Sequence, residues 1–277
     1  MNCGFLYVAM GKKYLMEAQI SARSLKRFTQ YPVAVITDDA GFKSDLFDII
    51  IYNEPSEDFI TKILGVKQTP FQRTVFLDTD TFVCSSINDL FSVLDLFDMA
   101  MTIDNFIHGY PFFKKYNPAY FIRYEKIIPE YNTGVIVFSN NNKVMKLFES
   151  WLKIHKAMHI KADMPSFREA LIENAATVGI SPLPFEYNFH GIKSFGFVYN
   201  EIKIIHERLG ERWSTLTEIM LPYEKMDRLA KRINKHKGKR IIIPYMGVIT
   251  SAFSPYSIKN KLKRMFGIKK TKKAETF

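Results

Sequence analysis

The first eighty residues alternate between short apolar runs and amphipathic stretches, and this alternation constrains the fold more than any other feature. Apolar runs of strand length lie at 5–10, 33–37, 47–53 and 74–77. Helical spacing of apolar residues is found at 14–28 and 57–67, and a further short helix is expected before residue 47. Strands that alternate with helices predict an α/β fold with a mostly parallel central sheet flanked by helices.

The rest of the chain continues this pattern less regularly. Two more strands are expected at 95–103 and 133–139, followed by helices at 143–158 and 166–175. The connection between those strands is rich in aromatic residues, and its length is typical of a lid, a binding loop or a small insert. We therefore predict one large domain over 1–220, with an insert at 104–131, and an appendage over 221–277.

The positive charge of the chain is concentrated in the predicted appendage. Residues 225–273 contain sixteen lysines and arginines against one acid, a net charge of +15, whereas the whole chain has +11. Within 257–273, apolar residues recur at helical spacing among lysines, which is typical of a helix on an anionic membrane surface. A solvated terminal helix is the alternative. No nucleic-acid-binding motif accompanies the charge, so nucleic acid is not the favoured partner.

The cysteines and the N-terminus bear on location. Cys3 and Cys84 are too few for a disulfide framework and lack zinc-site spacing, which favours a reducing compartment. The N-terminal segment MNCGFLYVAM has no basic leader, and its apolar run is too short for a signal peptide. We expect a cytoplasmic protein, peripheral at the inner face of a membrane if its basic tail binds lipid.

Two aspartates interrupt the apolar segment TVFLDTDTFV at 74–83. Close carboxylates repel each other, so Asp78 and Asp80 indicate a bound cation, a shared proton or a simple turn. They follow a predicted strand, and ligands of open parallel sheets gather where strands end. Their position therefore favours a functional role.

The segments around these aspartates resemble the GT-A glycosyltransferases of the glycogenin-like family, glycosyltransferase family 8. The central match is TKILGVKQTPFQRTVFLDTDTFVCSSINDLF at 61–91, with its DxD motif. Further matches, in the family's order, are YVAMGKKYLMEAQISARSLKR (7–27), NTGVIVF (132–138), ADMPSF (162–167), LPFEYNF (183–189) and HERLGERW (206–213). The resemblance covers about residues 5–213 and implies that 1–220 is a GT-A catalytic domain with a Rossmann-like architecture.

The resemblance also implies a metal-dependent reaction and its residues. A UDP-sugar, most simply a UDP-hexose, would donate its sugar to a glycan or lipid-linked acceptor with retention of anomeric configuration. Mn²⁺, or Mg²⁺, would be held by Asp78, Asp80 and His206. The donor would be bound by Ala9, Met10, Tyr14, Lys62, Asp78, Thr79, Asn188 and Arg212. The catalytic residues would be Asp163, Asn132 and Lys62.

Each of these residues also has an ordinary structural interpretation. His206 follows an apolar run and would fit a hydrogen-bonded core histidine. Lys62 would fit a solvated helix position, and Asp163 the N-cap of the following helix. Tyr14 would fit ordinary packing, and Asn132 and Asn188 would fit turns.

Two departures from the family pattern leave other functions open. Met164 stands where the family often has a glutamine, and HERLG has one residue more than H-x-x-G. If these departures abolish activity, the chain would be a catalytically inactive protein that binds sugar nucleotides. The segment DTDTF also resembles the nucleophile motif of haloacid-dehalogenase-type phosphatases, in which Asp78 would attack phosphate. That motif normally opens its domain, whereas here about seventy residues precede it.

Overall fold

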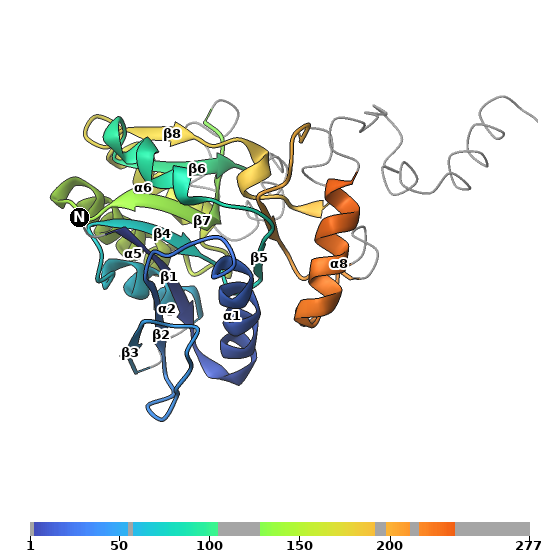
Figure 1. The fold of residues 1–277 in the computed structure, drawn as a ribbon. Coiled ribbons are helices and arrows are strands. Elements are labelled where there is room, and N and C mark those ends of the chain that lie inside the picture. The colour runs from blue at the N-terminus through green and yellow to red at the C-terminus, as the bar shows by residue number, and fades with distance from the viewer. Residues whose placement is uncertain (1–2, 55–57, 105–127, 192–197, 211–215, 236–277) are drawn as a thin grey trace, which may run out of the picture.

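A seven-stranded sheet forms the centre of the computed structural model, which describes residues 3–54, 58–104, 128–191, 198–210 and 216–235 (Figure 1). The strand order is β3-β2-β1-β4-β7-β6-β8. The strands are β1 (Cys3–Ala9), β2 (Val33–Thr37), β3 (Ile49–Tyr52), β4 (Arg73–Leu77), β6 (Met99–Ile103), β7 (Tyr131–Ser139) and β8 (Ile180–Pro182). The predicted α/β fold with a mostly parallel sheet is confirmed: only β7 pairs antiparallel to its neighbours, β4 and β6.

The inverted strand β7 places residues far apart in sequence at one edge. β4 and β6 end at this edge, which we call the carboxyl edge, whereas β7 begins there. The first residues of β7, including Asn132 and Gly134, therefore lie beside the residues that follow β4. The backbone N–H of Asp78 donates to the carbonyl of Gly134 at 2.8 Å.

Helices cover both faces of the sheet. Successive side chains of a strand point to opposite faces, and here those on both faces are apolar and need cover from water. In β1, Leu6 packs in one core cluster, while Phe5 and Tyr7 pack in another. The cluster of Leu6 includes α2 (Asp58–Lys67), α5 (Asn142–Met158) and α6 (Met164–Glu173). The cluster of Phe5 includes α1 (Gly11–Leu25) and the 3₁₀ segment η1 (Asn88–Asp95).

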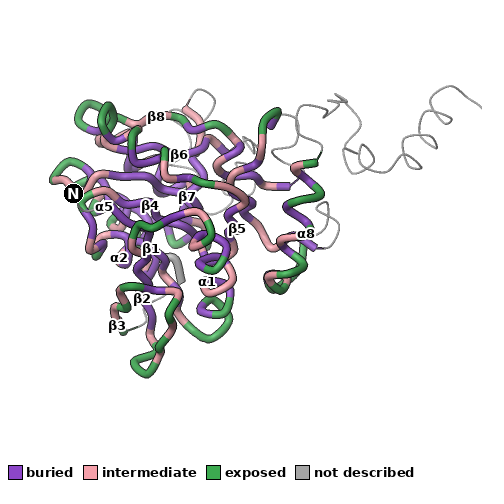
Figure 2. Tube along the Cα trace, in the orientation of Figure 1, coloured by how far each residue is buried: buried purple, intermediate pink, exposed green. Residues whose placement is uncertain are grey.

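A smaller two-stranded sheet extends from the carboxyl edge. It pairs β5 (Thr81–Val83) antiparallel with β9 (Ile204–His206), next to the short 3₁₀ segment η2 (Phe185–Tyr187). The buried face of α8 (Tyr223–Asn234) packs against Phe82 and Ile205, while its outer face is exposed (Figure 2). The first helix of the predicted appendage thus shares an apolar cluster with β5 and β9. The boundary at residue 220 stays a prediction.

One predicted helix was wrong, and one predicted strand is shorter than expected. The short helix expected before residue 47 is absent from the described structure, where 38–48 forms turns and bends. Asp39 and Ser44 bond to the backbone two residues further on, and such local bonds compete with helix formation. The strand expected at 95–103 begins only at Met99, because η1 occupies the residues up to Asp95. Most of the insert predicted at 104–131, and all of 257–273, lie outside the described residues.

Candidate active site

The aspartate pair lies in a tight turn between β4 and β5. The carbonyl of Asp78 accepts hydrogen bonds from the N–H of Thr81 at 3.2 Å and from its hydroxyl at 2.7 Å. The apolar residues before the turn belong to β4 of the central sheet, and those after it belong to β5 of the two-stranded sheet. Both strands are buried. Both carboxylates are thereby held at the carboxyl edge.

Asp78, Asp80 and His206 offer one ligand atom each within 4.8 Å of one another, the group in the described part of the chain that fits a metal ion. His206 Nε2 lies 3.4 Å from Asp80 Oδ1 and 3.6 Å from Asp78 Oδ2. Adjacent ligands of an octahedral ion, each about 2.1 Å from it, are about 3.0 Å apart. The two distances to Nε2 are thus close to this spacing, and the mixed carboxylate and imidazole donors suit a transition-metal ion better than Ca²⁺.

A chain of hydrogen bonds fixes which nitrogen of His206 carries a proton. Asn132 donates to Asp104 at 3.1 Å and accepts from the N–H of Gly134 at 2.9 Å, so the orientation of its amide is determined. Its oxygen therefore accepts from the Asn188 amide nitrogen at 2.9 Å. The Asn188 oxygen then faces His206 Nδ1 at 2.8 Å and needs a proton there. This leaves Nε2 to face the carboxylates, as a metal ligand requires.

Gly134 makes room for the histidine ring. A Cβ atom built at this position would lie 1.8 Å from His206 Cε1. A side chain at Gly134 would therefore displace the ring from the aspartates. The glycine of the N-T-G segment is thus explained by space next to His206.

Lys62 lies buried between two carboxylates. Its ammonium is 2.9 Å from Asp78 Oδ1 and 2.9 Å from Asp163 Oδ2. Although burial disfavours its charge, the ion pairs with Asp163 and Asp78 raise the pKa of Lys62. The interpretation of Lys62 as a solvated residue was wrong. Asp163 does stand at the N-cap position of α6, but its side chain makes no capping bond and accepts from Thr133 at 2.9 Å.

Charged neighbours shift the pKa values of two residues of the metal group, Asp80 and His206. Burial opposes ionisation of Asp80, but His206 and Arg208 outweigh it and lower the pKa of this carboxyl. The same attraction raises the pKa of His206, despite the opposing effect of burial. Without a metal ion, a proton on Nε2 thus stabilises the aspartates, and a bound ion would take its place.

The residues expected to bind the nucleotide lie at the end of β1 and the start of α1. Ala9 is buried, Met10 precedes the first turn of α1, and the Tyr14 side chain is 44% exposed. The interpretation of Tyr14 as a packing residue was therefore wrong. Thr79 donates to Glu17 at 3.2 Å, which links α1 to the DxD turn. Arg212 lies outside the described residues.

Several residues of the site were missed by the sequence analysis, namely Glu17, Asp104, Thr133, His190 and Arg208. Arg208 lies 3.0 Å from Asp80 and forms two 2.7 Å bonds to Glu17. The rings of His190 and His206 meet edge to face, with centroids 4.3 Å apart. Glu17, Thr133 and Arg208 lie in segments that resemble the family, and Arg208 also occupies the lengthened HERLG loop, whereas Asp104 and His190 carried no such signal. Met164, whose sulfur lies 3.8 Å from the Asn132 amide nitrogen, sits at the site as expected.

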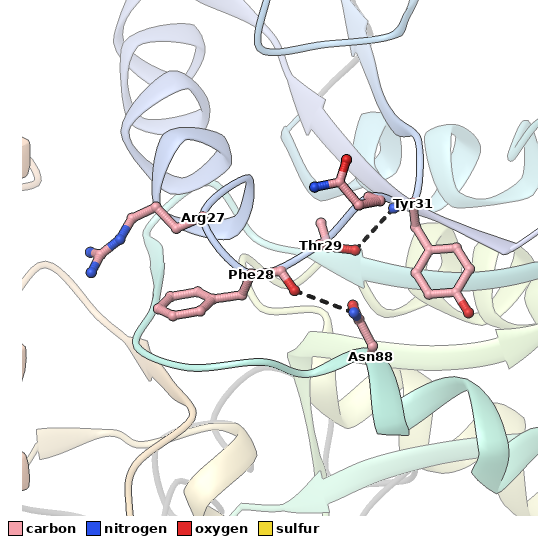
Figure 3. A pocket seen from close by; sticks show the side chains of 6 residues that line it. Arg27, Phe28, Thr29, Tyr31 and Asn88 are labelled. Carbon is pink, nitrogen blue, oxygen red and sulfur yellow. Dashed lines mark hydrogen bonds between the residues drawn. The ribbon is translucent and has the colours of Figure 1, made fainter.

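A separate shallow pocket lies between the end of α1 and the start of η1 (Figure 3). Its lining residues are Arg27, Phe28, Thr29, Gln30, Tyr31 and Asn88. Asn88 donates to the Phe28 carbonyl at 3.3 Å, and the Tyr31 N–H donates to Thr29 at 3.1 Å. The 15-residue helix α1, about 22 Å long, separates this pocket from the carboxyl edge. We assign it no role in the site.

The comparisons with known proteins concern the fold. No protein-family model and no curated protein matches the sequence. Mouse xyloside xylosyltransferase 1, apo form, is similar in structure with a TM-score of 0.51 at 14% identity, over 74% of this chain and 97% of that one. The galactosyltransferase LgtC in complex with donor and acceptor sugar analogs gives 0.53 at 14%, over 82% and 95%. An active-site mutant of LgtC gives 0.52 at 15%, over the same shares.

Proposed function

We propose that this chain, which has the fold of the GT-A glycosyltransferases, is a metal-dependent glycosyltransferase. The observation that carries the proposal is the meeting of Asp78, Asp80 and His206 at the carboxyl edge, with Nε2 of His206 facing both carboxylates. The donor is a nucleoside diphosphate sugar, a UDP-hexose by resemblance. The acceptor is a glycan or a lipid-linked sugar, and the reaction retains the anomeric configuration.

A divalent ion, Mn²⁺ in this proposal or Mg²⁺ as the alternative, would be held by Asp78, Asp80 and His206. When bound, it would supply Lewis acidity to the diphosphate leaving group. Lys62 holds Asp78 and Asp163 together, because its buried ammonium lies 2.9 Å from each carboxyl group and offsets their repulsion. Asp163 and Asn132 would act at the reacting sugar, and the base would stack on Tyr14, whose ring is exposed.

The remaining donor contacts are proposed from the same edge. Ala9 and Met10 would contribute backbone contacts beside the base, and Thr79 and Asn188 would line the diphosphate and sugar. Arg212 would neutralise phosphate charge. This group is supported by position: β1 runs parallel to β4, so Ala9 and Met10 lie at the same edge as Thr79, and Asn188 bonds to His206. Arg212 lies outside the described residues.

The proposed membrane contact is supported by the outer face of α8. Lys225, Arg228, Arg232 and Lys235 recur at helical spacing on its exposed side, opposite the buried apolar face. Basic side chains near an anionic bilayer contribute about 1 kcal/mol each. Among the described residues, no helix is both long and apolar enough to cross a bilayer. We propose peripheral binding at the cytoplasmic face, through 257–273 together with α8.

A panel of nucleotide sugars tests the transferase activity. Each donor is incubated with Mn²⁺, and release of nucleoside diphosphate is compared between the wild type and Asp80→Asn. We expect one donor to be turned over and the variant to lose at least about 100-fold of the rate. Asp95→Asn is the matched control, because Asp95 is an exposed aspartate paired with Arg73 away from the site.

The same panel separates the alternatives. Hydrolysis of phosphomonoesters that depends on Asp78 would replace the proposal with the phosphatase. Tight binding of a nucleotide sugar without release of nucleoside diphosphate would replace the proposal with an inactive binding protein. The presence of Met164 at the site would then account for the lost activity. Equal rates for the wild type and Asp80→Asn would remove the metal site from the reaction.

Vesicle co-sedimentation tests the membrane contact. The full chain and a form lacking 255–277 are mixed with phosphatidylglycerol vesicles and with neutral vesicles. We expect the full chain to bind the anionic vesicles more strongly than the shortened form does. Equal binding by both forms would refute a role of the tail.

A further inference from the structure

A side-chain cation already occupies part of the metal group. Arg208 Nη1 lies 3.0 Å from Asp80 Oδ2, while His206 Nε2 faces the other oxygen of the same carboxylate at 3.4 Å. Each oxygen of Asp80 thus faces a nitrogen of a different side chain. A metal ion that binds Asp80 must share the carboxylate with Arg208.

The guanidinium is fixed in this position by a buried anchor. Glu17, only 3% exposed, accepts two bonds of 2.7 Å from Arg208. The same carboxylate accepts from the Met220 N–H at 3.1 Å and from the Thr79 hydroxyl at 3.2 Å. Four bonds from three segments hold Glu17, and a bidentate carboxylate holds the planar guanidinium in one orientation. Moving Arg208 away from Asp80 would leave Glu17 buried without its main partner.

Arg208 therefore opposes the binding of a divalent ion at this site when no nucleotide is present. We infer that Arg208 competes with the metal ion for Asp80, so that the site has a low affinity for the ion alone and a much higher affinity in the presence of a nucleoside diphosphate. The competition has two parts: one lone pair of Asp80 is engaged, and a fixed positive charge lies next to the ion. This inference rests on the proposed function, because it concerns the same site.

The nucleotide would reverse the balance of charge. Arg208 Cζ lies 5.8 Å from the centroid of the exposed Tyr14 ring, on the side of the site where the donor would bind. A diphosphate brings negative charge that attracts both Arg208 and the ion, so the repulsion between the two cations is offset. Ion and nucleotide then bind more tightly together than either does alone, which is a coupling between two ligands of one site.

Binding of Mn²⁺ measures this coupling without enzyme turnover. Free Mn²⁺ is quantified by electron paramagnetic resonance during titration of the full chain, with and without UDP. We expect weak binding of Mn²⁺ alone and at least about tenfold tighter binding with UDP. In Arg208→Gln, Mn²⁺ alone should bind at least about tenfold more tightly than in the wild type, and the gain from UDP should shrink. Arg73→Gln, which removes an arginine at the start of β4, should leave both affinities unchanged.

Arg208→Gln leaves Glu17 buried and charged, so a second variant guards against loss of the fold. Glu17→Gln with Arg208→Gln removes both charges and should tighten Mn²⁺ binding in the same direction by a smaller factor. Unchanged or weaker Mn²⁺ binding in both variants, with UDP-dependent binding intact in the wild type, would overturn the inference and leave the proposed function standing. Absence of Mn²⁺ binding in every form, with or without UDP, would refute the metal site and hence both.

Discussion

The two edges of the central sheet carry ion pairs of similar length and different surroundings. At the carboxyl edge, Lys62 lies 2.9 Å from Asp78, and the two side chains are 10% and 26% exposed. At the opposite edge, Arg73 lies 2.7 Å from Asp95, and these side chains are 29% and 60% exposed. Distance therefore does not distinguish the pairs. Burial does, because a buried charge is expensive to leave unpaired, whereas an exposed pair contributes little.

This comparison separates the candidate site from the rest of the surface. A protein gains little stability by collecting Asp78, Asp80, Asp163 and Lys62 at one edge, since like charges repel and desolvation opposes each of them. Strongly perturbed and mutually dependent charges of this kind cluster at functional sites. Substitutions at the carboxyl edge should therefore have larger effects than matched substitutions elsewhere.

The largest expected effect follows from removing the buried lysine. Lys62→Met leaves Asp78 and Asp163 without their shared cation, so the free energy of unfolding should fall by about 3–5 kcal/mol. Lys67→Met, on the same helix, breaks only a 3.6 Å pair with Glu149, whose side chain is 64% exposed, and should change it by less than about 0.5 kcal/mol. Urea denaturation of both variants measures the difference. Equal losses would erase the distinction between the two kinds of pair.

The next prediction concerns space at the carboxyl edge. Gly134→Ala places a methyl group in the position of the His206 ring, so affinity for Mn²⁺ in the presence of UDP should fall by about 100-fold or more. Gly41→Ala is the matched control, because its new Cβ would meet only Asp39 at an ordinary 3.5 Å. Titration of Mn²⁺ with both variants tests this. An unaltered affinity in Gly134→Ala would mean that His206 is not a ligand.

A smaller effect on metal affinity is expected from Asn188, which bonds to the proposed ligand His206. Asn188→Leu removes the acceptor that holds the proton on His206 Nδ1, and loss of such a supporting bond typically lowers metal affinity by about 10–100-fold. Asn53→Leu, which breaks a bond between the surface side chains of Asn53 and Gln68, should leave the affinity unchanged. If both variants bind Mn²⁺ like the wild type, the hydrogen-bond chain does not orient His206.

The sequence was informative about these edges where the signal is local. The four strands β1 to β4 and the position of Asp78 and Asp80 after a strand could be predicted from apolar runs, because strand ends are marked by adjacent residues. The turns at 38–48 were mistaken for a helix, because the bonds of Asp39 and Ser44 to nearby backbone are not visible in the apolar pattern.

Pairs that join distant segments could not be predicted from the residues alone. Lys62 and Asp163 are about a hundred positions apart and meet only because β7 is inverted and α5 returns the chain to the same edge. Family resemblance named both residues but not their contact. The bond between Arg208 and Glu17 was not predicted, although both residues lie in segments that resemble the family, because their approach depends on how β9 pairs with β5.

The smallest effect should come from the edge opposite the site. Asp98 accepts hydrogen bonds of 2.9 Å from the Gly179 N–H and from Asn141, with Lys143 at 3.6 Å. Although burial opposes ionisation, these partners lower the pKa of Asp98 below its ordinary value. The carboxylate form is therefore favoured in the folded state, and its contribution to stability is present above the unfolded pKa of about 3.9.

Asp98→Asn should thus lower the free energy of unfolding by about 1 kcal/mol at pH 7. The difference from the wild type should shrink as the pH falls below about 4, because the wild-type carboxyl then takes up a proton and loses its advantage. Urea denaturation at several pH values measures it, with Asp45→Asn, at an exposed turn, as the control. A loss as large as that of Lys62→Met would show that the opposite edge is as sensitive as the site, and the contrast between the edges would fail.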